Sequence, residues 1–191
     1  ATRTVSTGPG QRTSLLQGLV DARSIPTDAW IVFFDDDVEF ALPGRTAFLD
    51  VAVAAQFDVA GAAIDVRQHR TYLHSLVGRA SVARTVGMVE IGPVVAFSPA
   101  ASDKLLPLPH DFGMGWGLDV RWSQVPSLRR GYVDASPVRH YGAVGASYDS
   151  TDELERFRQE LARAGLASQR EVARTLEVWR CWRPRPPWLT T

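Results

Sequence analysis

The stretch WIVFFDDDVEF, residues 30–40, constrains the fold of this 191-residue chain more than any other. Five large apolar residues at 30–34 run directly into the carboxylates of Asp35, Asp36 and Asp37. An apolar run without polar alternation is typical of a strand buried on both faces, as in the parallel sheet of an α/β domain. In open α/β sheets, ligands bind beyond the carboxyl ends of the strands. The pattern therefore predicts a site at the three aspartates.

Three adjacent carboxylates repel one another and require compensation by water, an arginine or a metal ion. Side chains at i and i+2 share one face of a strand, so Asp35 and Asp37 are expected to reach one target while Asp36 points elsewhere. Mg²⁺ and Mn²⁺ bind such carboxylates together with substrate phosphates. The alternative is a solvated acidic turn in which one aspartate caps the next helix.

Helical and extended segments alternate along the rest of the chain. One apolar face predicts a helix that begins near residue 13, and its members are Leu15, Leu16, Leu19 and Val20. Further helices are expected at 46–57, 100–109 and from 118, and strands at 57–66, 90–99 and 131–140. Residues 66–88 have weak periodicity and predict an irregular excursion. The alternation predicts a three-layer α/β/α sandwich with a mostly parallel central sheet.

The two ends of the chain differ from this core. Residues 1–10 are small, polar and rich in glycine and proline, which predicts a loop. Two capping boxes, Ser150 with Glu153 and Ser168 with Glu171, predict two helices near the C-terminus. The proline-rich segment 181–191 is expected to form no regular element. We therefore divide the chain into a core at 1–148 and an extension with a tail at 149–191.

The composition excludes several classes of protein. With 21 basic and 21 acidic residues, no net charge attracts the chain to nucleic acid or to an anionic membrane. The lone Cys181 excludes an intramolecular disulfide framework and a cysteine-rich metal site. No apolar run approaches the roughly 18 residues of a transmembrane helix, and no signal peptide is evident. The expectation is a soluble cytoplasmic protein.

A second candidate site is DFGMGWGLDVRW, residues 111–122. Gly115 and Gly117 permit positive φ and close approach of the backbone to a ligand. The indole of Trp116 can stack on the apolar face of a sugar ring. Asp119 falls in the first turn of the next helix, where the helix dipole favours its ionised form, and an ionised carboxylate can act as a general base. The alternative is structural, with Trp116 anchored in the core and Asp119 as a helix-start charge.

A third candidate is VDASPVRHYG, residues 133–142. A neutral imidazole at His140 can ligate a metal, and the guanidinium of Arg139 can neutralise phosphate. A single histidine near the end of a strand is also compatible with a purely structural role. His69, His74 and His110 share that alternative.

Taken in order, FFDDDVEF, VEIGPVVAFS, LLPLPHDFGMGWGLDVRW and YVDASPVRH resemble bacterial GT-A glycosyltransferases related to family 2, over roughly residues 10–148. This resemblance implies a nucleotide-diphosphate sugar donor and a sugar or other hydroxyl acceptor. Asp35 and Asp37 match the D-x-D pair that holds Mn²⁺ or Mg²⁺ and the donor diphosphate, and His140 matches a histidine that completes the metal site.

The same resemblance implies roles on the acceptor side. Asp119 matches the carboxylate that deprotonates the acceptor hydroxyl in inverting members, Trp116 would line the acceptor pocket, and Glu90 lies where acceptor contacts are often found. A complete domain of this kind begins with a strand and a loop that bind the nucleotide base. Only 34 residues precede Asp35, so the first strands are expected to lie outside this sequence. The incomplete sheet would leave an edge that another chain, such as a second copy in a homo-oligomer, could cover.

Three functions are compatible with these patterns. The first is a metal-dependent, inverting glycosyltransferase. The second is a metal-dependent phosphohydrolase that uses Asp35, Asp37 and His140, which leaves Asp119 and the glycine-rich loop without a role. The third is a non-catalytic carbohydrate- or partner-binding domain with the same fold.

Overall fold

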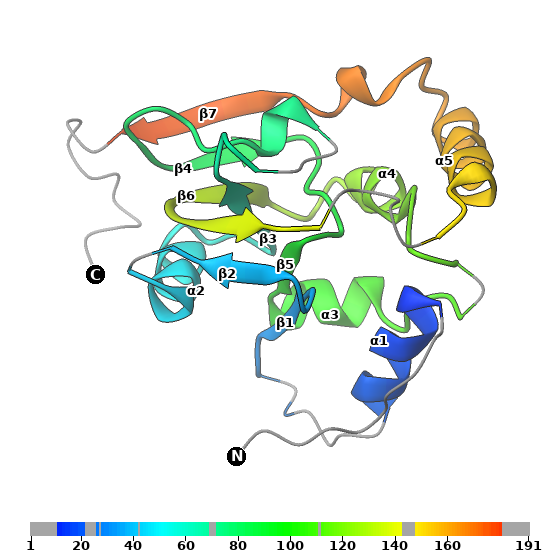
Figure 1. The fold of residues 1–191 in the computed structure, drawn as a ribbon, viewed down its shortest axis with the longest axis horizontal. Helices are drawn as coiled ribbons and strands as arrows, with labels where there is room; N and C mark the ends of the chain where they lie inside the picture. The colour runs from blue at the N-terminus through cyan, green and yellow to red at the C-terminus, as the bar shows by residue number, and fades with distance from the viewer. Residues whose placement is uncertain are drawn as a thin grey trace.

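A computed structural model describes residues 11–21, 26, 28–41, 43–68, 72–110, 112–142 and 148–180. In these residues an α/β fold is built on one seven-stranded sheet with five α-helices (Figure 1). The helices are α1 (Arg12–Asp21), α2 (Arg45–Ala54), α3 (Pro99–Leu105), α4 (Leu118–Ser123) and α5 (Thr151–Arg163), with short 3₁₀ turns η1 (Leu73–Ser75) and η2 (Gln169–Glu171). The strands are β1 (Ile31–Phe34), β2 (Val38–Phe40), β3 (Val59–Ile64), β4 (Ser81–Val86), β5 (Val94–Phe97), β6 (Arg130–His140) and β7 (Thr175–Arg180). The predicted loop at 1–10 and the predicted tail at 181–191 lie outside the described residues.

The predicted mostly parallel sheet is wrong. The strand order is β1-β5-β3-β6-β4-β7, with β2 paired to β6, and only β3 and β6 pair in parallel. The prediction rested on the apolar run at 30–34 and on the alternation of helices and strands. Neither pattern carries information on strand direction, since even the fully buried strands β3 and β5 pair antiparallel. Strands β1, β3 and β6 nevertheless share one direction, because β1 and β3 both oppose β5.

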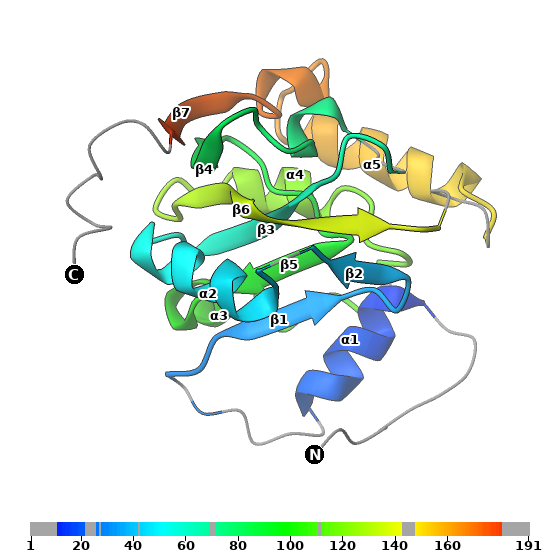
Figure 2. The ribbon, with the colours of Figure 1, turned by 60° about the vertical axis from the view of Figure 1, so that its left-hand side comes forward.

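Helices cover both faces of the sheet (Figure 2). Along β5, Val95 and Phe97 join one apolar cluster, which includes side chains of α3 and α4, whereas Val94 and Ala96 join a second cluster under α2. This alternation is the period of two expected of a strand with apolar layers on either side. The described helices are all too short or too polar to cross a bilayer.

Strand β1 and helix α1 differ from their predicted burial. Strand β1 lies at the edge of the sheet opposite β7. Only Phe33 of its residues is buried, and Phe34 is 54% exposed. On α1 the predicted apolar face is wrong at Leu19, which is exposed, while Thr13 and Gln17 are buried. These two polar residues are buried because they bond to the loop before α4: Thr13 Oγ1 donates to the carbonyl of Gly113, and Gln17 Oε1 accepts from a backbone N–H of the same loop.

Two further segments differ from their predicted structure. The predicted excursion at 66–88 contains η1 and the regular strand β4. The predicted second C-terminal helix is only η2, although its capping box between Ser168 and Glu171 is present, and the chain then continues as β7, which pairs with β4. Whether 148 ends a domain stays a prediction. The structure shows that α5 contacts α4 and that β7 belongs to the same sheet.

Candidate functional site

The acidic motif follows the carboxyl end of β1, in a turn that leads into β2. The backbone N–H of Asp35 donates to the carbonyl of Pro93 at 3.0 Å, which extends the β1–β5 pairing by one residue. Strand β2 then pairs with the end of β6, with Val38 opposite His140. This register places His140, the last residue of β6, beside the aspartates. Local sequence patterns cannot predict it.

Asp35, Asp37 and His140 form a cluster whose potential ligand atoms all lie within 4.8 Å of one another. His140 Nε2 is 3.3 Å from Asp37 Oδ2. The other oxygen of Asp37, Oδ1, is buried and has no hydrogen-bond partner among the described residues. A buried carboxylate oxygen in that state costs free energy unless a ligand satisfies it. Two carboxylates and one imidazole therefore fit a divalent cation such as Mn²⁺ or Mg²⁺.

A glycine keeps this cluster compact. A Cβ added at Gly142 would lie 2.0 Å from Asp37 Oδ2, so no side chain fits at that position without displacing the carboxylate. Gly92 similarly faces Asp35, because a Cβ added there would lie 3.1 Å from Oδ2. The aspartates thus lie directly against backbone on two sides.

Two predicted binding residues are not among the clustered ligand atoms. Asp36 is exposed, in the turn between β1 and β2. Arg139 precedes His140 on β6 and therefore points to the opposite face of the strand. There it lies 3.8 Å from the carboxylate of Glu39, which also accepts a hydrogen bond from the hydroxyl of Tyr141.

The glycine-rich loop has the backbone geometry that its sequence predicts. Gly115 and Gly117 have φ values of 97° and 98°, in the region that favours glycine. Glu153 on α5 holds the loop: its carboxylate accepts from the N–H of Met114 at 3.0 Å and from that of Trp116 at 3.3 Å. The capping box predicted from Ser150 and Glu153 does not form: the Ser150 side chain makes no cap bond, and the Glu153 carboxylate binds the loop.

Trp116 is fixed by its indole nitrogen as well as by its backbone. Nε1 donates to the hydroxyl of Tyr148 at 3.0 Å. Burial raises the pKa of Tyr148. The negative charges of Glu153 and Asp35 also raise this pKa, and the positive charge of Arg12 lowers it. Tyr148 therefore contacts the glycine-rich loop, and sequence patterns gave no indication of it.

Asp119 lies in the first turn of α4, as predicted, but it is only 3% exposed. The backbone N–H groups at the start of α4 do favour its ionised form, but they are not the largest influence on its pKa. Burial raises the pKa of Asp119 to about 6, and the backbone N–H groups of Val120 and Gly117 and the hydroxyl of Tyr72 offset this only in part. Desolvation outweighs the dipole here because the side chain is withdrawn from water.

Other polar side chains that are largely withdrawn from water lie near Asp119, and together with it they form a buried polar group. Burial, followed by the charges of Asp119 and Glu90, raises the pKa of Tyr72. Glu90 is 7% exposed, and its N–H donates to the hydroxyl of Tyr132 at 3.0 Å. Burial lowers the pKa of His74 to about 4, and its Nε2 lies 3.0 Å from a backbone carbonyl, which supports the structural alternative for that histidine. His69 lies outside the described residues.

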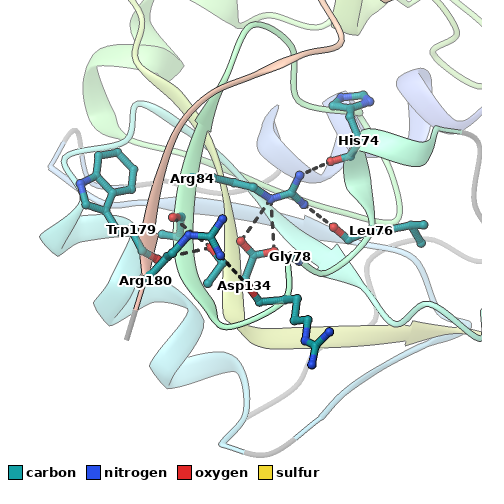
Figure 3. Close-up of polar contacts among 10 residues, drawn as sticks. His74, Leu76, Gly78, Arg84, Asp134, Trp179 and Arg180 are labelled. Carbon is teal, nitrogen blue, oxygen red and sulfur yellow. Dashed lines mark hydrogen bonds and ion pairs between the residues drawn. The ribbon is translucent and has the colours of Figure 1, made fainter. Parts of the chain in front are cut away.

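A buried ion pair supports the segment that carries Tyr72 (Figure 3). Arg84 Nε lies 3.1 Å from Asp134 Oδ2, and the terminal nitrogens of Arg84 donate to the carbonyls of His74 and Leu76. The N–H of Gly78 donates to Asp134 Oδ1 at 2.7 Å. Residues 74–78 are therefore tied to β4 and β6 by charged hydrogen bonds.

Glu153→Gln tests how firmly α5 holds the glycine-rich loop. A Gln side chain has one acceptor oxygen, so its NH₂ group would face a loop N–H in either orientation, that of Trp116 or that of Met114 together with Arg156. We expect the free energy of unfolding to fall by about 1–3 kcal/mol in urea titrations. Glu155→Gln, on the exposed side of the same helix, should change it by less than about 0.5 kcal/mol. Equal losses in both variants would show that Glu153 does not hold the loop.

Comparisons with protein-family models, with curated proteins and with solved structures find no match to this chain.

Proposed function

We propose that this chain is a metal-dependent glycosyltransferase domain of the GT-A type, which moves a sugar from a nucleotide-diphosphate donor to an acceptor hydroxyl with inversion. The observation that carries the proposal is the convergence of Asp35, Asp37 and His140, which are up to 105 residues apart in the sequence. The sequence motifs and the family resemblance together point to each of the three as a metal ligand, and their potential ligand atoms lie within 4.8 Å of one another.

The donor side of the proposed reaction rests on this cluster. Asp35, Asp37 and His140 would hold Mn²⁺ or Mg²⁺, with the buried Oδ1 of Asp37 as one ligand atom. The cation would neutralise the charge that develops on the leaving nucleoside diphosphate. Asp36 is exposed beside the cluster, where it can contact the donor but does not converge with the ligand atoms.

The acceptor side rests on Asp119 and the glycine-rich loop. A carboxylate with a pKa of about 6 is a stronger base than an ordinary aspartate and remains largely ionised at neutral pH. Asp119 would take the proton of the acceptor hydroxyl as that oxygen attacks the anomeric carbon. Trp116 offers an aromatic face to the acceptor, and Glu90, in the same buried polar group, would contact its hydroxyls.

The arrangement of the strands is compatible with this proposal. The acidic motif follows the carboxyl end of β1, and β3 and β6 run in the same direction. Helices lie on both faces of the sheet, as in an α/β/α sandwich. A homo-oligomer and a cytoplasmic location remain predictions from the sequence.

Two alternatives make different demands on the same residues. A phosphohydrolase would use the acidic cluster but would leave Asp119 and Trp116 without a role. A non-catalytic binding domain is favoured by one observation, the 3% exposure of Asp119, because a base must reach its substrate. Nucleotide binding and the effect of Asp119→Asn on transfer separate the three.

Isothermal titration with UDP, GDP and dTDP, each with and without Mn²⁺, tests the proposed donor site. We expect one nucleoside diphosphate to bind only when Mn²⁺ is present, and Asp37→Asn to weaken that binding by at least about 10-fold. Asp28→Asn removes an exposed carboxylate and should leave binding unchanged. Absence of binding for all three nucleotides in the presence of Mn²⁺ would refute a transferase function for this chain.

A further inference from the structure

Arg12, the first residue of α1, forms an ion pair with Asp35, one of the candidate metal ligands. Its Nε and Nη2 lie 2.9 Å and 2.8 Å from the same oxygen, Oδ1 of Asp35. Nη2 also donates to the carbonyl of Ile91 at 3.2 Å. The Arg12 side chain is only 13% exposed and that of Asp35 is 31% exposed, so water screens this pair less than it screens a surface ion pair.

This contact bears on the charge of the acidic cluster. Two nitrogens of Arg12 converge on Asp35 Oδ1, and the other oxygen, Oδ2, lies against Gly92. A cation that takes Asp35 must therefore displace the guanidinium or bind beside it. Displacement would leave a positive charge, 13% exposed, whose one remaining partner among the described residues is the carbonyl of Ile91, and such a charge is costly.

A diphosphate would remove that cost. The guanidinium group presents a planar fork of donors that matches phosphate oxygens, and it stays charged at every pH of interest. If phosphate oxygens replaced Asp35 as the partner of Arg12, the carboxylate would become free for the metal and no charge would be left unpaired. Metal and diphosphate would then each favour the binding of the other, which is the definition of coupled binding.

We propose that Arg12 is an internal cation that competes with the metal for Asp35 and couples metal binding to the arrival of an anionic diphosphate. The inference deepens the proposed function and rests on it for the identity of that diphosphate. It gives Arg12 two effects: Arg12 suppresses binding of the metal alone and supports binding of the metal together with the anion.

The test measures binding of Mn²⁺ to the whole chain by calorimetry and by the electron paramagnetic resonance of free Mn²⁺, with and without pyrophosphate. For Arg12→Gln we expect Mn²⁺ alone to bind roughly 10-fold more tightly than to the wild type, and pyrophosphate to give no further gain. In the wild type, pyrophosphate should strengthen Mn²⁺ binding by a similar factor. Arg45→Gln removes an exposed arginine on α2 and should behave as the wild type.

A second variant separates the effect of the positive charge of Arg12 from that of its planar donor group. Arg12→Lys keeps the positive charge but not the planar fork, so Mn²⁺ alone should bind as in the wild type while the gain from pyrophosphate decreases. Unchanged or weaker binding of Mn²⁺ by Arg12→Gln, with thermal unfolding in EDTA confirming that the variant is folded, would overturn the proposal. Tighter binding by Arg12→Lys would overturn it as well, because the charge would then not be the cause.

These results are independent of the nucleotide titrations. The probes are Mn²⁺ and pyrophosphate, and neither requires a site for a nucleoside or a sugar. If no nucleoside diphosphate binds but Arg12→Gln still binds Mn²⁺ more tightly, the proposed function fails and the competition at Asp35 stands. If nucleotide binding is intact and Arg12→Gln shows no gain, only the competition fails.

Discussion

Asp119→Asn is expected to abolish sugar transfer and, at the same time, to stabilise the folded protein above pH 7. Removal of a general base lowers the rate by about 10²- to 10⁴-fold. Metal-dependent nucleotide binding should remain nearly intact, because the ligand cluster at Asp35, Asp37 and His140 is formed by other elements. Loss of nucleotide binding in this variant would exclude Asp119 as the base.

The gain in stability follows from the pKa of Asp119. Its folded-state value of about 6 lies above the ordinary 3.8, so the folded protein holds this proton more tightly than the unfolded chain does. The stability provided by the neutral form is fully present below about pH 4 and is lost as the pH rises through 6. A shift of about two units corresponds to about 3 kcal/mol that an amide, which does not ionise, would not lose.

Urea unfolding of the wild type and of Asp119→Asn at pH 4.5 and pH 8 measures this effect. The difference in the free energy of unfolding between the two proteins should be larger at pH 8, in favour of the variant. Asp50→Asn, at an exposed position of α2, should show a difference within about 0.5 kcal/mol at both pH values. A variant that is less stable than the wild type at pH 8 would show that ionised Asp119 is well solvated or paired.

Removal of one partner of the buried ion pair should have the largest effect on stability. Arg84 and Asp134 are 5% and 4% exposed, and together they bind the backbone of residues 74–78 (Figure 3). Asp134→Asn would leave the guanidinium of Arg84 buried without its counter-charge. We expect the free energy of unfolding to fall by about 3–5 kcal/mol. Arg158→Met, which removes an exposed partner of a 3.8 Å ion pair, should cost less than about 1 kcal/mol.

A double-mutant cycle separates the pair from the rest of its surroundings. Arg84→Met, Asp134→Leu and the double variant are unfolded in urea, and the double variant should lose less than the sum of the single losses because no buried charge remains. Full recovery is not expected, since the carbonyls of His74 and Leu76 also lose the donors of Arg84. Strictly additive losses would show that the two side chains do not stabilise each other.

Several features of the candidate site could be predicted from short stretches of sequence. The apolar run at 31–34 followed by aspartates predicted a strand that delivers carboxylates beyond its end, and β1 does so. The glycines of GMGWG predicted positive φ, and Gly115 and Gly117 have it. The capping box between Ser168 and Glu171 formed as predicted. Each of these features depends on residues a few positions apart, because backbone geometry and local hydrogen bonds are decided at that range.

Other features were decided only by tertiary structure. The register of β2 against β6 brings His140 to Asp37, and contacts across 23 residues place Arg12 on Asp35. Desolvation, which depends on everything packed around a group, overrides the helix dipole at Asp119. The same packing buries β3 and β5 in a largely antiparallel sheet whose direction apolar runs cannot reveal. The sequence by itself thus determined which residues carry the candidate chemistry, and the long-range pairing of strands and the exclusion of water decided which of them meet and in what charge state.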